Sequence, residues 1–293
     1  MIRFGSFWSG FLSPYEVSCL SSFARKGHNV VLYSYEKMQN LPAGIQQMDA
    51  GQIVDRSYLH RFITNGKSNV AAFSDYFRYL MLLKTDLCWI DADLFLLQSF
   101  DVDMGGNLFV REDRSNICNA LLRINSAALE LKEIIAKTET IIDRDVPWAT
   151  AQNFNARTFR KNRRQLAASM KDPKEFMPVQ YDEYYKLLLP EFAEECAERC
   201  RKAKTVHLYN NILDKIGVCK ILLPPEGSYL HYLFSAQKQV DGFSGVYPVS
   251  TMRALIENWR MRFTGECLAP KALAKQAIPS IARTIQKIRW KGL

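Results

Sequence analysis

The 293-residue sequence has no long hydrophobic run. No apolar stretch reaches the roughly 18 residues that a membrane-spanning helix needs. The first residues, MIRFGSFWSGFLS, also lack the long apolar segment and the small-residue cleavage site of a signal peptide. We therefore expect a cytoplasmic protein that is either soluble or held peripherally at the inner face of the plasma membrane.

Cysteine is sparse and odd in number. The chain has seven cysteines, and several lie inside apolar runs, such as Cys88 in LCWI, which favours reduced core thiols over a disulfide framework. Cys196 and Cys200 lie one helical turn apart, but no second Cys or His pair at zinc-binding spacing accompanies them. The sequence has no internal repeat and no low-complexity linker. Its length fits one large α/β domain or two small ones.

Acidic residues are outnumbered, 30 against 39 Lys and Arg, which gives a formal charge of +9. This charge favours anionic partners: nucleotide phosphates, nucleic acid or an acidic membrane surface. Residues 270–293, PKALAKQAIPSIARTIQKIRWKGL, carry basic but no acidic side chains, interleaved with Ile and Trp at helical spacing. The pattern is typical of a basic amphipathic helix on an anionic membrane, and a solvated helix packed on its own domain is the alternative. We therefore divide the chain into a domain over 1–265 and a tail over 266–293.

The first 35 residues predict a β-α-β unit. Residues 2–7 have the composition of a strand. Ser13-Pro14-Tyr15-Glu16 has the form of a capping box with Pro at the first helical position, which predicts a helix to about Arg25. Gly27 ends this helix, and residues 28–35 read as a second strand. A right-handed crossover between the two strands predicts a parallel sheet.

A second unit follows a mixed connection over residues 36–68. Residues 69–84 have helical length and period and are apolar nearly all round, which predicts a buried helix. Residues 86–90 predict a buried strand, and residues 115–125 predict another strand, followed by a helix to about Thr140. The fold class is therefore α/β, with a mostly parallel sheet flanked by helices.

Charged residues interrupt the apolar segment NVAAFSDYFRYLMLLKTDLCWIDADLFLL, residues 69–97. Asp75 and Arg78 share one helix face, as a structural ion pair or as a ligand-binding pair. Asp91 and Asp93 follow the buried strand, at the edge where open α/β sheets bind ligands. In an extended chain their side chains share one face and can reach one cation. Carboxylates suit Mg²⁺ or Mn²⁺, which proteins hold together with substrate phosphates.

The block FSDYFRYLML…CWIDADLFLL resembles the core signature of sugar-nucleotide glycosyltransferases with an Asp-x-Asp motif, of the Och1-like and clostridial-toxin-like group. The similarity extends to FWSG (7–10), to ICNALLRIN (117–125), which is similar to the family's strand at the sugar pocket, and to VHLYNN (206–211), which is similar to its segment at the metal and diphosphate. It is scattered over about residues 1–230. The chain departs from the family where Lys84-Thr85-Asp86 stands for a Gly-Gly turn and AQNFN (151–155) for a Gly-Pro.

The resemblance implies a GT-A-like, nucleotide-binding fold and a metal-dependent transfer of a hexose from a nucleotide sugar, with UDP as the expected nucleotide. It also implies retention of anomeric configuration. We expect a saccharide or lipid-linked acceptor, the lipid-linked form because of the basic tail. Together with the tail and the missing export signal, the resemblance suggests a role in bacterial surface polysaccharide or lipopolysaccharide synthesis.

By the same resemblance, Asp75 would bind hydroxyls of the donor sugar, and Arg78 would bind the sugar or orient Asp75. Asp93 would coordinate Mn²⁺ or Mg²⁺ directly, and Asp91 would contact the metal or the ribose. His207 would be a third metal ligand or a diphosphate contact, with an ordinary structural histidine as the alternative.

Five further residues are assigned to the donor site in the same way. Trp8 would stack on uracil, with an ordinary exposed or core tryptophan as the alternative. Trp89 would wall the nucleotide pocket. Asn119 and Gln152 are candidates for the sugar pocket, and Asn211 for the nucleotide-sugar site.

Two other classes of protein share parts of this pattern. Haloacid-dehalogenase-like phosphatases also place Asp-x-Asp after an apolar strand, but usually near the N-terminus and followed by x-Thr or x-Val, whereas here Leu94-Phe95 follows. A nucleic-acid-binding protein fits the charge, with RTFRKNRR (157–164) and the tail as phosphate contacts. No nucleic-acid-binding motif is present, so nucleic acid is not the expected partner.

Overall fold

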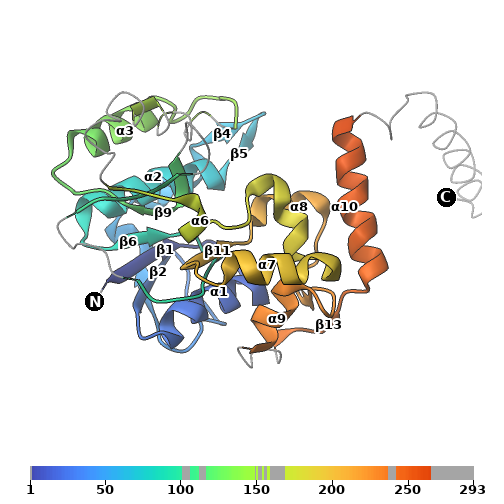
Figure 1. Cartoon of the computed structure of the whole chain (residues 1–293). Coiled ribbons are helices and arrows are strands. Elements are labelled where there is room, and N and C mark those ends of the chain that lie inside the picture. The colour runs from blue at the N-terminus through green and yellow to red at the C-terminus, as the bar shows by residue number, and fades with distance from the viewer. Residues whose placement is uncertain are drawn as a thin grey trace, which may run out of the picture.

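The computed structural model describes residues 2–100, 106–111, 117–148, 169–236 and 242–264, together with residues 150, 154, 157 and 158. In this part of the chain a central sheet is flanked by helices (Figure 1), which confirms the predicted α/β fold class. The tail over 266–293, Gln152 and residues 159–164 of the basic stretch RTFRKNRR lie outside the described residues. The division of the chain at residue 265 therefore stays a prediction.

The helices lie between and after the strands of the sheet. They are α1 (Pro14–Arg25), α2 (Val70–Lys84), α3 (Leu129–Glu139), α6 (Pro173–Phe176), α7 (Ala193–Cys200), α8 (Asn210–Ile216), α9 (Tyr229–Ala236) and α10 (Val249–Thr264). Short 3₁₀ helices are η1 (Ala50–Gln52), η2 (Arg56–His60), η4 (Tyr181–Leu187) and η5 (Pro190–Phe192). Among the described residues no helix is both long enough and apolar enough to cross a bilayer.

The main sheet is mostly parallel, as predicted. Its strands are β1 (Arg3–Phe7), β2 (Asn29–Ser34), β3 (Ile45–Asp49), β6 (Cys88–Ile90), β8 (Leu108–Arg111), β9 (Ile117–Arg123) and β10 (Met170–Lys171). Their order across the described sheet is β10-β8-β9-β6-β1-β2-β3. The neighbours β3, β2, β1 and β6 are parallel, as are β8 and β10, whereas β9 runs antiparallel to both β6 and β8.

The β-α-β unit forms for the reasons that the sequence predicts. The Tyr15 N–H donates to Ser13 Oγ over 3.2 Å, and the Ser13 N–H donates to Glu16 Oε2 over 2.7 Å, which completes the capping box of α1. Gly27, with φ +81°, adopts the left-handed conformation just after the helix and turns the chain into β2. β1 and β2 then pair in parallel along their length.

Alternate residues of β2 face opposite sides of the sheet. Val30 and Leu32 belong to the apolar cluster that contains Phe23 of α1, whereas Val31 and Tyr33 belong to the cluster built around α2. The two helices therefore cover opposite faces of the sheet, and α3 packs on the outer side of α2. The sheet therefore lies between α1 and α2, and the carboxyl ends of β1 and β6 border a cavity.

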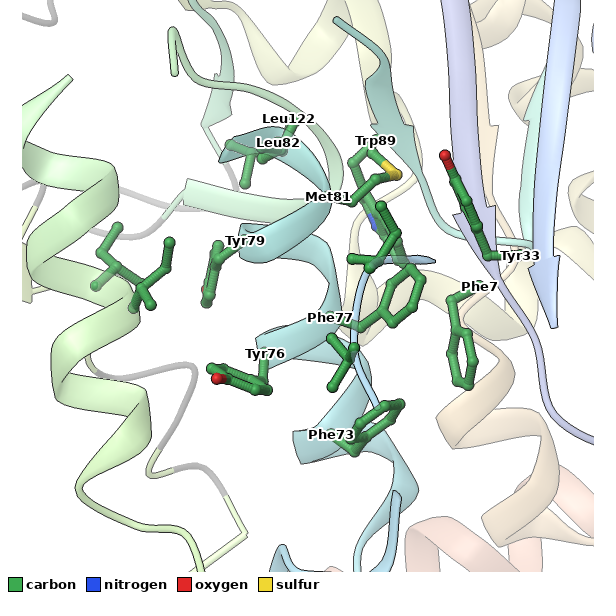
Figure 2. Close-up of a cluster of buried hydrophobic side chains, with 14 of the residues drawn as sticks. Phe7, Tyr33, Phe73, Tyr76, Phe77, Tyr79, Met81, Leu82, Trp89 and Leu122 are labelled. Carbon is green, nitrogen blue, oxygen red and sulfur yellow. The ribbon is translucent and has the colours of Figure 1, made fainter. Parts of the chain in front are cut away.

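α2 is buried almost all round, as its pattern predicts. Figure 2 shows this helix between the sheet and α3, with Phe77 facing Phe7 of β1 and Tyr76 on the α3 side. The ring centroids of Phe7 and Phe77 lie 4.6 Å apart, and the Tyr76 hydroxyl donates to Glu139 of α3 over 3.1 Å. Packing on both sides holds α2 rigidly, so any side chain that it directs to the strand ends is fixed in place.

The C-terminal half forms a second apolar cluster beside the sheet. β7 (Leu94–Leu96) lies outside the main sheet. It pairs antiparallel with β11 (Thr205–His207), with His207 opposite Leu94. Side chains of α7, α8, α9 and α10 pack around this pair. The small pairs β4 (Ile63–Thr64) with β5 (Lys67–Ser68) and β12 (Leu222–Leu223) with β13 (Gly245–Val246) complete the described strands. The β7–β11 pairing brings residues 205–211 to the end of β6.

Candidate active site

A cavity of about 590 Å³ opens at the carboxyl ends of β1 and β6. Residues 6–9, at the end of β1 and just after it, and the first turns of α2 form part of its wall. The turn between β6 and β7 and side chains from residues 207–215 form another part. This is the edge of the sheet at which the sequence predicts ligand binding. The cavity is large enough for a substrate-sized molecule.

Asp91 and Asp93 both line this cavity, but they are not in an extended strand. The Leu94 N–H donates to the Asp91 carbonyl over 3.1 Å, so residues 91–94 form a turn between β6 and β7. The predicted reason for their proximity, alternation along a strand, is therefore wrong. Their side chains converge because the turn bends the chain, while the Asp91 N–H still pairs with the Ala120 carbonyl of β9 at 2.8 Å.

Residues 207–210 make three polar contacts with Asp93. The Leu208 N–H donates to the Asp93 carbonyl over 3.0 Å, and the Asn210 N–H donates to Asp93 Oδ2 over 2.7 Å. His207 Nε2 lies 3.2 Å from Asp93 Oδ1. Tyr209, with φ +59° and ψ +56°, is left-handed, a conformation that is uncommon for a bulky residue and is often found at functional sites. With Tyr209 in this conformation, the N–H groups of its two neighbours, Leu208 and Asn210, both donate to Asp93.

Asp91, Asp93 and His207 can hold a metal ion. One ligand atom from each lies within 4.8 Å of the others, and no other three such side chains cluster in this way among the described residues. Two carboxylates and an imidazole form a donor set suited to Mn²⁺, and the carboxylates alone also suit Mg²⁺. The donors present therefore fit the predicted metal.

Electrostatics couple these three groups. Burial acts to lower the pKa of His207, but the Asp93 carboxylate and hydrogen bonds with Asp93 and Cys118 outweigh it and raise the pKa well above 6.5. Burial acts to raise the pKa of Asp93, but the charge and hydrogen bond of His207 leave it below its ordinary value. Without metal, His207 and Asp93 thus form an ion pair. Metal binding has to release the imidazole proton, so it is weaker at low pH.

Arg78 joins the two acidic parts of the site. Its Nη1 donates to Asp75 Oδ1 over 2.7 Å, and its Nη2 donates to Asp91 Oδ1 over 2.8 Å. The guanidinium carbon lies 4.7 Å from the ring centroid of Trp89, whose indole N–H also donates to Asp91 Oδ1 over 2.6 Å. Both hydrogen bonds to Asp91 use Oδ1, which leaves its Oδ2 for a ligand. The helix pair predicted from sequence is thus part of a larger network.

Asp75 is a buried acid with a raised pKa. Burial raises its pKa to about 6, although Arg78 and a 3.4 Å hydrogen bond from Asn119 favour the charged form. The folded chain therefore binds this proton more tightly than the unfolded chain does. The contribution of Asp75 to stability is complete at low pH and is lost as the pH rises through about 6.

Replacing Asp75 by Asn should remove this pH dependence, because an amide has no proton to lose. Relative to wild type, the free energy of unfolding of Asp75→Asn should rise by about 2.5 kcal/mol between about pH 4 and pH 7.5. Urea unfolding followed by far-UV circular dichroism measures it, with an unchanged m-value as the control. Two pH curves that run parallel would show that Asp75 is not the titrating group.

The remaining predicted residues fall into three positions. Trp8 and Asn211 line the cavity, and the Trp8 indole N–H donates to the Phe11 carbonyl over 3.2 Å. Trp89 also borders the cavity, but it is only 1% exposed, and its indole N–H donates to Asp91. Asn119 lies behind Asp75 and is not among the residues lining the cavity. Gln152 is outside the described residues.

Several cavity residues were not singled out from the sequence. Trp148 and Tyr181 line it with 40% and 42% of their surface exposed, and Lys215 Nζ lies 5.0 Å from the Trp148 ring centroid. Asn210 does carry a sequence signal, because it belongs to VHLYNN, which is similar to the family's segment at the metal and diphosphate. Trp148, Tyr181 and Lys215 carry no local sequence signal, because only the tertiary fold brings their segments together.

Comparisons with known proteins give similarities only among solved structures. No family model matches the chain, and no curated protein matches it. Among solved structures the chain is similar to "PaToxG Glycosyltransferase", with 12% identity and a TM-score of 0.36 over 57% of this chain and 76% of that chain. A similarity of this size says nothing about activity, which has to be inferred from the side chains of the site.

Proposed function

We propose that this protein is a metal-dependent glycosyltransferase that takes a hexose from a nucleotide sugar, with UDP as the nucleotide. The observation that carries the proposal is the cluster of Asp91, Asp93 and His207 at the end of β6, in the same cavity as the Asp75–Arg78 pair. A bound Mn²⁺ or Mg²⁺ supplies Lewis-acid stabilisation of the charge that develops on a leaving diphosphate.

Different side chains of the protein bind the metal and the donor sugar. Asp91, Asp93 and His207 hold the cation. Asp75, whose charge is offset by Arg78 only 2.7 Å away, accepts hydrogen bonds from hydroxyls of the donor sugar. We assign the retaining outcome from the resemblance. Among retaining routes we favour attack by the acceptor on the face that the diphosphate leaves over a covalent intermediate, because Asp75 suits donor binding better than nucleophilic attack.

Aromatic side chains are available for both the nucleotide and the acceptor in this cavity. Trp8 follows the first strand and lines the cavity, so we assign it to stacking on the uracil ring. Trp148 and Tyr181 present exposed aromatic surface to the same cavity, which suits the apolar face of an acceptor saccharide. We propose a saccharide or lipid-linked acceptor in bacterial surface polysaccharide synthesis, with residues 270–293 recruiting the enzyme to the membrane.

A donor screen tests the proposed activity. The full chain is incubated with UDP-, GDP- and CMP-sugars and Mn²⁺, and release of the free nucleotide is measured. We expect slow hydrolysis of a UDP-hexose that stops when EDTA removes the metal, because donor cleavage depends on the cation.

Three outcomes would contradict this proposal. The first is no turnover of any donor with Mn²⁺ or Mg²⁺, and the second is turnover that EDTA leaves unchanged. The third is phosphate release from a generic phosphomonoester without any UDP-sugar turnover, which would favour the phosphatase alternative.

A further inference from the structure

Glu16 is a fully buried acid outside the walls of the cavity. It lies in the first turn of α1 with 0% exposure, and it accepts more hydrogen bonds than the helix cap requires. Its Oε2 accepts the Ser13 N–H of the capping box at 2.7 Å. Its Oε1 accepts the Asn210 side-chain amide at 2.7 Å and the Lys220 ammonium at 2.9 Å. Half of this carboxylate is therefore directed away from its own helix, toward α8.

Asn210 connects Glu16 to the candidate metal ligand. Its side-chain N–H₂ donates to Glu16, and its backbone N–H donates to Asp93 Oδ2 over 2.7 Å. Glu16 thus restrains the side chain of the residue whose peptide group orients Asp93. Tyr209, immediately before it, is left-handed.

Lys220 supplies the charge that a buried carboxylate needs. Its Nζ lies 2.9 Å from Glu16 and 3.1 Å from Asp214, and its side chain is 15% exposed. Removing one partner of a buried ion pair leaves the other uncompensated. The ion pair with Lys220 therefore fixes Glu16, which in turn binds the Asn210 side chain.

We propose that Glu16, paired with Lys220, is a positioning residue for metal binding and acts on Asp93 through Asn210. The inference rests on the proposed function only in that Asp93 holds a cation. Groups that orient metal ligands contribute about 10- to 100-fold to metal affinity. A residue that only capped α1 would contribute nothing to that affinity.

Mn²⁺ alone is the probe that tests this inference. Free Mn²⁺ is titrated against the full chain and followed by electron paramagnetic resonance, for wild type, Glu16→Gln, Lys220→Met and Ser13→Ala. Gln can still complete a capping box, so Glu16→Gln keeps the helix cap but loses the charge and one acceptor. We expect Glu16→Gln and Lys220→Met to bind Mn²⁺ about tenfold more weakly than wild type. Ser13→Ala removes the side-chain acceptor of the same helix cap and should bind as wild type does.

The possible results separate the inference from the proposed function. Wild-type affinity in both Glu16→Gln and Lys220→Met overturns the inference, and so does an equal loss in Ser13→Ala, which would mean that only the helix cap matters. No Mn²⁺ binding by wild type overturns the metal role of Asp93 and the inference with it. Urea unfolding of each variant confirms that binding is measured on folded protein.

Discussion

Replacing Asp93 by Asn is expected to lower metal-dependent hydrolysis of the nucleotide sugar by about a thousandfold, or about 4 kcal/mol in the barrier. The amide oxygen can still accept the Asn210 N–H at Oδ2, but an amide N–H₂ then faces His207 and the metal position. Charge is removed at nearly constant shape, so the metal loses an anionic ligand while the turn at residues 91–94 keeps its contacts. Steady-state release of nucleotide, measured with saturating donor, reports the loss.

Asp86→Asn is the matched control for this experiment. Asp86 lies just before β6 and pairs with Arg3 at 3.1 Å, where both side chains are about half exposed. The same chemical change at the opposite end of the same strand should leave turnover as in wild type. Equal hydrolysis by Asp93→Asn and wild type would show that Asp93 does not hold the metal.

Replacing Arg78 by Met should destabilise the chain by about 3–5 kcal/mol, because it leaves two carboxylates in the interior without their common partner. Arg78 is 4% exposed, and it bonds Asp75 and Asp91 with separate nitrogens. Methionine has a similar length but no charge, so the main loss is electrostatic. Urea unfolding near pH 7.5 measures the free energy of unfolding.

Two further variants identify the cause of this loss. Arg3→Met breaks an exposed ion pair and should change stability by only about 0.5 kcal/mol or less. Asp75→Asn combined with Arg78→Met should recover part of the stability that Arg78→Met loses, since it removes one of the uncompensated acids. If the double variant is no more stable than Arg78→Met, the loss comes from packing against Trp89 and not from charge.

Local signals were sufficient for the elements that surround the site. The capping box at Ser13 and Glu16, the all-round apolar helix over 69–84 and the apolar strand before Asp91 each act within a few residues, and each appears in the structure where it was predicted. β3 was not predicted, because IQQMD is mostly polar and pairs at the edge of the sheet. Its strand conformation comes from the neighbouring β2 and not from its own residues.

The same division holds within the candidate site. The Asp75–Arg78 pair follows from helical spacing, and the proximity of Asp91 and Asp93 was expected, although a turn and not a strand produces it. The approach of His207 to Asp93 had no basis in spacing and came only from resemblance. The contacts of Asn210 with Glu16 and Asp93 had no sequence signal, because they depend on the pairing of β7 with β11.

The sequence by itself determined the α/β class, the first parallel strands and the acidic end of the buried strand, because periodicity, caps and turns depend on neighbouring residues. Only the tertiary structure decided which side chains meet the acids. Arg78 of α2 reaches Asp91 in the turn after β6. Residues 207–210 contact Asp93 from more than 100 residues further along the chain. Such contacts depend on how the layers pack, and no short stretch of sequence encodes that packing.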